Sequence, residues 1–282
     1  MTIAYLNGEF LPKDEARISV LDRGFIFADG IYEVMPAYNR IIFRLEEHLQ
    51  RLQNSLDAIH ISNPHSNEEW KHIMEQLVEK NSADDQSLYL QITRGVAERD
   101  HVFSDDMVPT VFAMSRPLVK KESHNGVKAI TKEDIRWKFC DIKSIALLPG
   151  VLLRYDAHQQ GAYEAILIRD GFLTEGAASN VFIVNGNIVA TPPKDHKVLP
   201  GITRDLTVEL LQKNAITIEE RPITEAELHT AEEIWITSST QEIVPIVALD
   251  GRPVGSGDVG EMWHQANTIY QNFKRDFSGE DL

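Results

Sequence analysis

The spacing of apolar residues predicts where the chain forms helices. Five of them are separated by intervals of four, three, four and three positions, which places them on one face of a helix: Leu45, Leu49, Leu52, Leu56 and Ile59. Arg51 lies off that face, so its side chain either points to water or reaches a ligand at the inner edge of the domain. A second helix is expected over residues 66–80, where Ser66 can be the N-cap and Glu69 completes a capping box.

Alternation of apolar and polar residues, together with turn-forming dipeptides, predicts the strands. Residues 3–11 alternate loosely around Asn7-Gly8, a strong hairpin signal, and Asn185-Gly186 indicates a second hairpin between strands at 180–184 and 188–190. Further strands are expected at residues 17–21, 41–43, 87–93, 110–115, 127–130, 136–142, 164–169 and 233–237, with another that ends at residue 38. Further helices are expected at residues 147–160, 199–214 and 260–277, and from residue 225.

The order of these elements indicates the fold class. Strands and helices do not alternate regularly, so we expect a mixed α/β, or α+β, protein and no doubly wound parallel sheet. Residues 116–126 follow no period and are the best candidate for a linker. The expected division is an N-terminal α/β domain at 1–118, a linker at 119–126 and a C-terminal α/β domain at 127–282 that carries Lys143.

Composition and charge exclude several classes of protein. The 43% hydrophobic and 25% charged residues are those of a globular protein, and no apolar run approaches the roughly 20 residues of a membrane span. A net charge of −15 disfavours nucleic acid and anionic membranes as partners, although local arginines can still bind a small anion. The N-terminus lacks an export signal and the chain has one cysteine, Cys140, so a reducing cytoplasm is expected. Within an apolar strand, that cysteine is best interpreted as a small buried residue.

Two polar stretches carry the candidate chemistry. Lys143 lies at the exit of a short half-apolar strand, and a polar cluster over residues 174–182 includes Glu175. A lysine and a carboxylate are what pyridoxal 5′-phosphate (PLP) needs, the first for a Schiff base and the second for the ring nitrogen. The alternative for Lys143 is a solvated lysine at a strand end, paired with Asp141.

The remaining parts of a PLP site have weaker candidates. The helix that starts at Gly201-Ile202-Thr203 has first-turn amides that suit a phosphate, although any helix start after a proline turn has them. The turn Ser238-Ser239-Thr240 is rich in hydroxyls and can equally be a plain loop. Arg99 and His101 can converge on a carboxylate if the backbone bends, or they belong to a solvated loop.

Other site types are excluded. Asp22 and Asp29 lack the His and Cys spacings of a metal site, so no metal is expected. No Gly-x-Gly-x-x-Gly follows a strand and no Gly-x-Ser-x-Gly occurs, which removes the nucleotide-binding and serine-hydrolase interpretations.

Short motifs occur in order along nearly the whole chain: Asp22-Arg23-Gly24, Asp29-Gly30-Ile31-Tyr32-Glu33-Val34, Thr93-Arg94-Gly95, Glu133-Asp134-Ile135-Arg136-Trp137, Cys140-Asp141-Ile142-Lys143-Ser144, Thr174-Glu175-Gly176 and Gly201-Ile202-Thr203-Arg204-Asp205. In these motifs the chain resembles the class IV (fold type IV) PLP-dependent aminotransferases, and most closely the D-amino-acid aminotransferases. It departs from their pattern at Ala177-Ala178, where the family has serines, and at Pro149, where it has a glycine.

The resemblance implies a role for each matching residue. Lys143 would form the Schiff base and shuttle the proton, and Glu175 would pair with the pyridine nitrogen. The other cofactor-binding residues would be Arg51, Arg136, Ser179, Asn180, Leu199, Gly201, Ile202, Thr203, Ser239 and Thr240. Tyr32, Arg99 and His101 would bind the substrate carboxylate, the last two coming from the partner subunit of a homodimer.

The implied activity is transamination of D-amino acids such as D-alanine with 2-oxo acids such as 2-oxoglutarate. A lyase of the same fold, 4-amino-4-deoxychorismate lyase, would share Lys143, Glu175 and the phosphate site. Branched-chain or (R)-amine transaminases are further alternatives. A catalytically silent PLP carrier is the most distant one.

Overall fold

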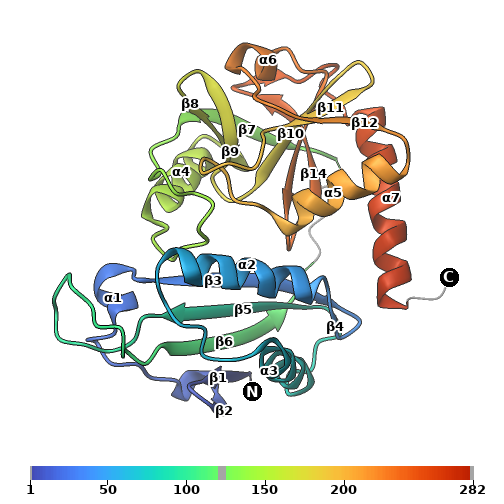
Figure 1. Ribbon diagram of the computed structural model, residues 1–282. Coiled ribbons are helices and arrows are strands. Elements are labelled where there is room, and N and C mark those ends of the chain that lie inside the picture. The colour runs from blue at the N-terminus through green and yellow to red at the C-terminus, as the bar shows by residue number, and fades with distance from the viewer. Residues whose placement is uncertain (1, 120–124, 280–282) are drawn as a thin grey trace. The chain divides into compact units, whose positions relative to one another are not determined.

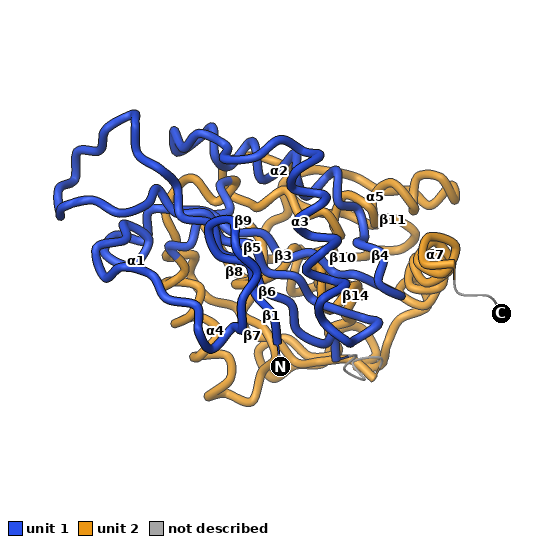
Figure 2. Tube along the Cα trace, turned by 90° about the horizontal axis from the view of Figure 1, so that it is seen from below, with its two compact units in different colours: residues 1–119, 142–146 blue, residues 120–141, 147–282 orange. Residues whose placement is uncertain are grey.

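The computed structural model describes residues 2–119 and 125–279, which form two compact units (Figure 2). Unit 1 is Met1–Val119 with Ile142–Ala146, and unit 2 is Lys120–Asp141 with Leu147–Leu282. Residues 120–124 of the expected linker lie outside the described residues, and the domain boundaries at 118 and 126 stay a prediction. In the described part of the chain, no helix is both long and apolar enough to cross a membrane.

Lys143 belongs to unit 1, whereas the sequence pattern predicted it in the C-terminal domain. The reason is backbone pairing with the strand that starts at Gly30. The Tyr32 amide donates to the Lys143 carbonyl at 2.9 Å, and the Ile145 amide donates to the Gly30 carbonyl at 3.0 Å. These long-range hydrogen bonds fix residues 142–146 on unit 1, although they follow part of unit 2 in the sequence.

Unit 1 is built on a six-stranded antiparallel sheet in the order β2-β1-β6-β5-β3-β4 (Figure 1). Its strands are β1 (Ile3–Leu6), β2 (Glu9–Pro12), β3 (Gly30–Tyr38), β4 (Ile41–Ile42), β5 (Gln86–Thr93) and β6 (Thr110–Pro117). Its helices are η1 (Lys13–Glu15), α1 (Arg23–Phe27), α2 (Leu45–Ala58) and α3 (Asn67–Glu79). Leucines of α2 and α3 share one core with β3 and β5, as the helical period predicts.

Local signals of unit 1 are mostly confirmed. The Asn7-Gly8 turn joins β1 and β2, and Ser66 and Glu69 form the capping box of α3. The strand expected at residues 17–21 is wrong. The Ser19 hydroxyl accepts from the Leu21 amide at 3.1 Å, a local bond that competes with strand pairing.

Unit 2 is built on a nine-stranded mixed sheet in the order β12-β11-β10-β13-β14-β7-β8-β9, with β15 paired to β14. The strands are β7 (Val127–Glu133), β8 (Glu164–Arg169), β9 (Phe172–Gly176), β10 (Asn180–Asn185), β11 (Ile188–Thr191), β12 (Thr217–Glu220), β13 (Glu233–Ser238), β14 (Glu242–Leu249) and β15 (Arg252–Pro253). The helices are α4 (Leu148–Gln159), α5 (Ile202–Lys213), α6 (Glu225–His229) and α7 (Glu261–Ser278). Pro149 lies in the first turn of α4, where no intrahelical amide bond is lost.

Residues 136–142 were expected to form a strand and instead form a loop. The Asp134 carboxylate accepts a hydrogen bond from the Arg136 amide at 3.2 Å and turns the chain out of β7. Cys140 is nevertheless buried, as expected, and its thiol donates to the Trp137 carbonyl at 3.3 Å. The strands β9 and β12 were not predicted, because polar residues interrupt their apolar pattern. The strand β14 was not predicted either, although its run is apolar, because Pro245 within it argues against a strand.

Candidate active site

In unit 1, Lys143 lies against Tyr32 of β3. Its Nζ is 4.3 Å from the centroid of the Tyr32 ring, and Tyr32 stacks on Tyr89 of β5 with centroids 5.8 Å apart. The Lys143 amide donates to the Ser55 hydroxyl of α2 at 3.2 Å. The structure therefore brings together the predicted lysine and one predicted substrate-binding residue. Lys143 is only partly buried, so its amine can reach a ligand.

Arg51 is buried and does not point to water, which corrects one of the two expectations for it. Its Nε and Nη2 donate to the two carboxylate oxygens of Glu33, both at 2.8 Å. His48, one turn before Arg51 on α2, contacts the same carboxylate through Nδ1 at 2.8 Å. Glu33, His48 and Arg51 thus form a buried charged cluster inside unit 1.

Electrostatics explain why this cluster is stable. Burial by itself raises the pKa of Glu33, but the charge and hydrogen bonds of Arg51 and the bond from His48 outweigh it, so this pKa lies well below its usual value. Burial lowers the pKa of His48, and the Glu33 carboxylate opposes that effect only in part. Glu33 is therefore a stable carboxylate that fixes the Arg51 guanidinium.

Arg99 and His101 lie in the exposed loop between β5 and β6. The Arg99 guanidinium is 5.3 Å from the centroid of the Phe27 ring, and the His101 ring centroid is also 5.3 Å from it. Arg23 of α1 donates to the carbonyls of Asp100 at 2.5 Å and His101 at 3.4 Å, which shapes the loop. Both predicted residues are thus exposed on unit 1, beside Phe27.

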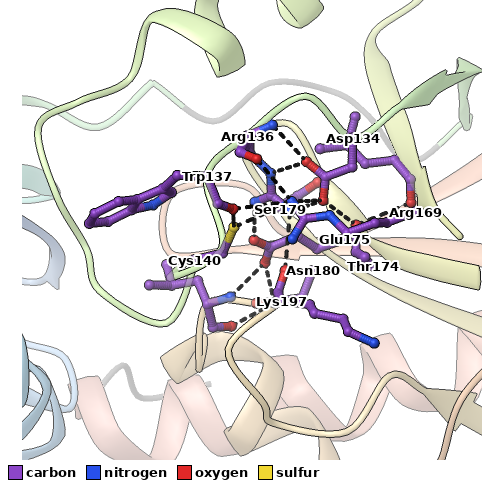
Figure 3. A network of polar contacts seen from close by, with 12 residues as sticks. Asp134, Arg136, Trp137, Cys140, Arg169, Thr174, Glu175, Ser179, Asn180 and Lys197 are labelled. Carbon is purple, nitrogen blue, oxygen red and sulfur yellow. Dashed lines mark hydrogen bonds and ion pairs between the residues drawn. The ribbon is translucent and has the colours of Figure 1, made fainter.

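In unit 2, Glu175 of β9 is the centre of a polar network (Figure 3). One oxygen accepts hydrogen bonds from the side-chain nitrogen Nδ2 of Asn180 and from the backbone amide of Leu199, both at 3.0 Å. The other oxygen pairs with Nη1 of Arg136. Glu175 is only 4% exposed, and this burial raises its pKa to about 7 against the lowering effect of Arg136.

The start of α5 lies beside this network. Gly201 is its N-cap and no side chain caps the helix, so the first-turn amides of Ile202 and Thr203 have no intrahelical acceptor. A Cβ added at Gly201 would lie 2.0 Å from Oδ1 of Asn180, so the site requires glycine there. Asn180 also donates to the Leu199 carbonyl at 2.8 Å.

The hydroxyl residues have different surroundings. The Ser179 hydroxyl donates to the buried Glu164 of β8 at 2.9 Å, so it supports the turn before β10. Ser239 and Thr240 lie in the turn after β13, partly buried. Because β13 pairs with β10, with Asn180 opposite Thr237, this turn follows the strand next to Asn180.

Several polar and ionisable residues of the two networks were not assigned a role from the sequence: Glu33, His48, Asp134, Arg169 and Thr174. A signal existed for one of them. Glu33 interrupts an otherwise apolar alternation of Ile31, Met35 and Ala37 on the inner face of β3, and a charge at such a position indicates a buried partner.

Comparison with known proteins identifies the family. The family model described as amino-transferase class IV matches residues 30–249 of the 282. The chain belongs to the class IV aminotransferases. The matched range runs from the start of β3 to the end of β14, so it contains Lys143, Glu175 and the start of α5.

Relatives of this aminotransferase chain are similar over nearly their whole length. A D-alanine aminotransferase of Bacillus licheniformis is 42% identical over 94% of this chain and 95% of its own. Proteins of the same name are 39% identical in Listeria monocytogenes (94% of this chain, 93% of that one) and 36% identical in Staphylococcus aureus (95% and 96%).

Solved structures show that the fold is that of the fold type IV aminotransferases. The branched-chain amino acid aminotransferase of Escherichia coli has a TM-score of 0.90 at 23% identity, covering 99% of this chain and 96% of that one. The branched-chain aminotransferase of the archaeon Thermoproteus uzoniensis, solved with norvaline, has a TM-score of 0.88 at 24% identity (100% and 96%). A fold IV transaminase of Curtobacterium pusillum has a TM-score of 0.84 at 20% identity (96% and 98%). At these identities the likeness concerns the fold alone.

Proposed function

We propose that this chain catalyses PLP-dependent transamination between D-amino acids, such as D-alanine, and 2-oxo acids, such as 2-oxoglutarate. The observation that carries the proposal is the 42% identity to a D-alanine aminotransferase over 94% of the chain. The site residues support it, because a lysine amine, a buried carboxylate and an uncapped helix start are all present. We further propose a cytoplasmic homodimer.

The residues of unit 2 fit PLP. The start of α5 has no side-chain cap, so its first-turn amides suit a phosphate group, and glycine at 201 lets this helix start lie directly beside Asn180. Glu175 has a pKa raised to about 7 by burial, and a protonated pyridine nitrogen beside it would stabilise its ionised form. In the part of unit 2 that the structure describes, both features lie around Asn180. PLP, when bound, supplies an electron sink for the carbanion formed at the substrate Cα.

Each residue then has a defined task. Lys143 would hold PLP through Nζ, and its amine would carry the proton that leaves the substrate Cα. Glu175 would accept a hydrogen bond from the ring nitrogen and so favour its protonated form. The phosphate would be held by Arg51, Ile202, Thr203, Ser239 and Thr240, and the ring would be lined by Arg136, Ser179, Asn180 and Leu199.

Substrate orientation is assigned to three residues. Tyr32 lies beside Lys143, so it can direct the α-carboxylate of the substrate next to the base. The guanidinium of Arg99 of the partner subunit and the imidazole of His101 of the partner subunit supply the charge-assisted hydrogen bonds. Both side chains are exposed on unit 1, which is required if they are to reach the active site of a second subunit.

The experiment is a two-substrate assay. The purified protein, saturated with PLP, is mixed with D-alanine and 2-oxoglutarate, and pyruvate and D-glutamate are measured. Both products should form in equal amounts, and Lys143→Ala should form neither. Aminodeoxychorismate is tested in parallel, and faster release of 4-aminobenzoate would overturn the proposal in favour of a lyase.

A second readout tests the cofactor alone. Reduction with borohydride should attach the PLP mass to the peptide that contains Lys143. The matched control removes another lysine, Lys132 of β7, which pairs with Asp156 at 3.3 Å. In Lys132→Ala, the peptide that contains Lys143 should be labelled as in the wild type. Label at another lysine would contradict the assignment.

A further inference from the structure

We propose that Asp134 is a positioning residue that holds the guanidinium of Arg136 against Glu175 and thereby favours the charged form of Glu175. The network lies wholly in unit 2, at the end of β7 and on β9 (Figure 3). The effect of Asp134 on catalysis rests on the proposed function. The effect of Asp134 on Arg136 and Glu175 does not, and separate experiments test the two effects.

Asp134 fixes the orientation of Arg136. It accepts from Nε and Nη2 of Arg136, both at 2.8 Å, and from the Arg136 backbone amide at 3.2 Å. This two-point contact uses one edge of the planar guanidinium and directs the remaining nitrogen, Nη1, toward Glu175. Nη2 of Arg136 also donates to the Lys197 carbonyl at 3.2 Å, but this single neutral acceptor does not replace the two-point contact with the carboxylate at 134.

Asp134 is itself immobilised. Its side chain is 0% exposed, and the Thr174 hydroxyl donates to Oδ2 at 2.9 Å. Nη2 of Arg169 on β8 pairs with the same oxygen at 2.9 Å. Because Thr174 directly precedes Glu175, the strand that carries the catalytic carboxylate also fixes the group that positions its arginine.

The charges that face Glu175 within unit 2 act in opposite directions. Burial raises the pKa of Glu175 most, Arg136 lowers it, and the negative charge of Asp134 adds a smaller increase. Cys140, Arg169 and Lys197 also belong to this network, and burial raises the pKa of the Cys140 thiol. Asp134 therefore has two effects on Glu175, a direct repulsion and an indirect support through Arg136.

These two effects predict opposite results when Asp134 is neutralised. If Asp134 acts only as a nearby charge, Asp134→Asn lowers the pKa of Glu175. If it positions Arg136, the variant raises that pKa, because Asn presents a donor to Arg136 and the guanidinium is released. The sign of the change separates a positioning role from a bystander role.

The experiment is an NMR titration of the full-length, cofactor-free protein with isotope-labelled glutamate carboxyl groups, assigned with Glu175→Gln. Asp134→Asn should raise the pKa of Glu175 by about one unit or more. In an Arg136→Ala background the same substitution should lower it, since only the direct repulsion remains. An unchanged or lowered pKa in the single variant would overturn the proposal.

Two further variants keep the test decisive. Asp250→Asn is the matched control, because Asp250 also accepts from a backbone amide and a hydroxyl, both of Thr131, at 2.8 and 2.7 Å. It should leave the pKa of Glu175 unchanged. If Asp134→Asn does not fold, Arg136→Lys tests the same contact, since lysine keeps the charge but loses the two-point geometry. It should also raise the pKa, and an unchanged value would count against the proposal.

The consequence for catalysis is measured on the PLP-loaded enzyme. Asp134→Asn should lower kcat for D-alanine about tenfold or more with little change in KM, because Asp134 does not touch the substrate. If the NMR result holds while the PLP-loaded wild type does not transaminate D-alanine, the proposed function fails and the positioning role stands. If the wild type transaminates and the titration shows no rise, the positioning role fails alone.

Discussion

Glu33 and Glu175 are both buried carboxylates paired with an arginine, yet their pKa values move in opposite directions. Glu33 receives two nitrogens of Arg51 and one of His48, and these contacts outweigh the cost of burial. Glu175 receives one nitrogen of Arg136, whose other edge is bound to Asp134. The other two donors to Glu175 are the neutral amides of Asn180 and Leu199, and the negative charge of Asp134 lies nearby. The number of contacts with a cationic guanidinium therefore decides which carboxylate stays ionised and which one titrates.

The raised pKa of Glu175 predicts a pH-dependent stability. Its folded value of about 7 exceeds the unfolded value of 4.5, so its favourable contribution is fully present below pH 4.5 and is lost as the pH rises through 7. Glutamine at position 175 cannot ionise, so the Glu175→Gln variant does not lose this contribution to the unfolding free energy as the pH rises. Relative to wild type, the cofactor-free variant should gain about 2–3 kcal/mol in unfolding free energy between pH 5 and pH 8. Urea unfolding at both pH values measures this, and a difference that is constant with pH would contradict it.

The Glu33–Arg51 pair predicts a strongly non-additive effect on stability. Arg51→Gln leaves a buried carboxylate without its main partner and should cost about 3–5 kcal/mol. Adding Glu33→Gln removes the unpaired charge, so the double variant should be more stable than Arg51→Gln alone. Denaturant unfolding of both single variants and the double variant gives the coupling energy. Additive losses would show that Arg51 is not needed to compensate the Glu33 charge.

At the scale of elements, α5 and β10 form the side of unit 2 at which we propose that the cofactor binds. Gly201 permits the uncapped start of α5 to lie directly beside Asn180, the first residue of β10. Asn180 in turn contacts Glu175 of β9 and the carbonyl of Leu199. A helix start and two strands thus meet through one amide side chain, and a change in any of them affects the others.

Gly201→Ala should weaken PLP binding about tenfold or more. Its Cβ would displace the Asn180 amide, which cannot move without breaking its bonds to Glu175 and Leu199. Titration with PLP, followed by absorbance, measures the Kd. Gly186→Asn is the control, because Gly186 has a φ of +58° and open space around its Cα, and asparagine tolerates that backbone. Equal Kd values for Gly201→Ala and wild type would contradict the proposed phosphate site.

At the scale of the whole molecule, the proposed homodimer shares each active site between two subunits. Lys143 acts in its own subunit, whereas Arg99 acts in the partner. Lys143→Ala and Arg99→Ala should each be inactive toward D-alanine. In a hybrid dimer of the two variants, one site has both residues intact.

Mixing these two inactive variants should therefore restore activity. After subunits exchange, half of the dimers are hybrids with one working site of two, so about a quarter of the wild-type activity should return. Mixing Lys143→Ala with Tyr32→Ala is the control and should restore nothing beyond the residual activity of Tyr32→Ala, because both residues act within one subunit. No recovery in the first mixture would contradict the shared site.

The sequence by itself determined the local elements and the family. Helical spacing located α2, α3, α5 and α7, and the ordered motifs identified Lys143 and Glu175 as candidates. These features depend on neighbouring residues and on short motifs, which a single chain displays directly. The loop at 136–142 was mistaken for a strand because its apolar residues fit a strand pattern, whereas the Asp134 carboxylate turns the backbone.

Only the tertiary structure decided which buried charges meet. Glu33 and Arg51 are 18 positions apart, and Arg136 and Glu175 are 39 apart. Long-range backbone pairing likewise placed Lys143 on unit 1. Such contacts arise because the folding of each sheet brings distant residues together. A buried charge is then stable only when an ion pair or hydrogen bonds compensate its loss of water. The protonation state of Glu175 follows from those contacts and from no local pattern in the chain.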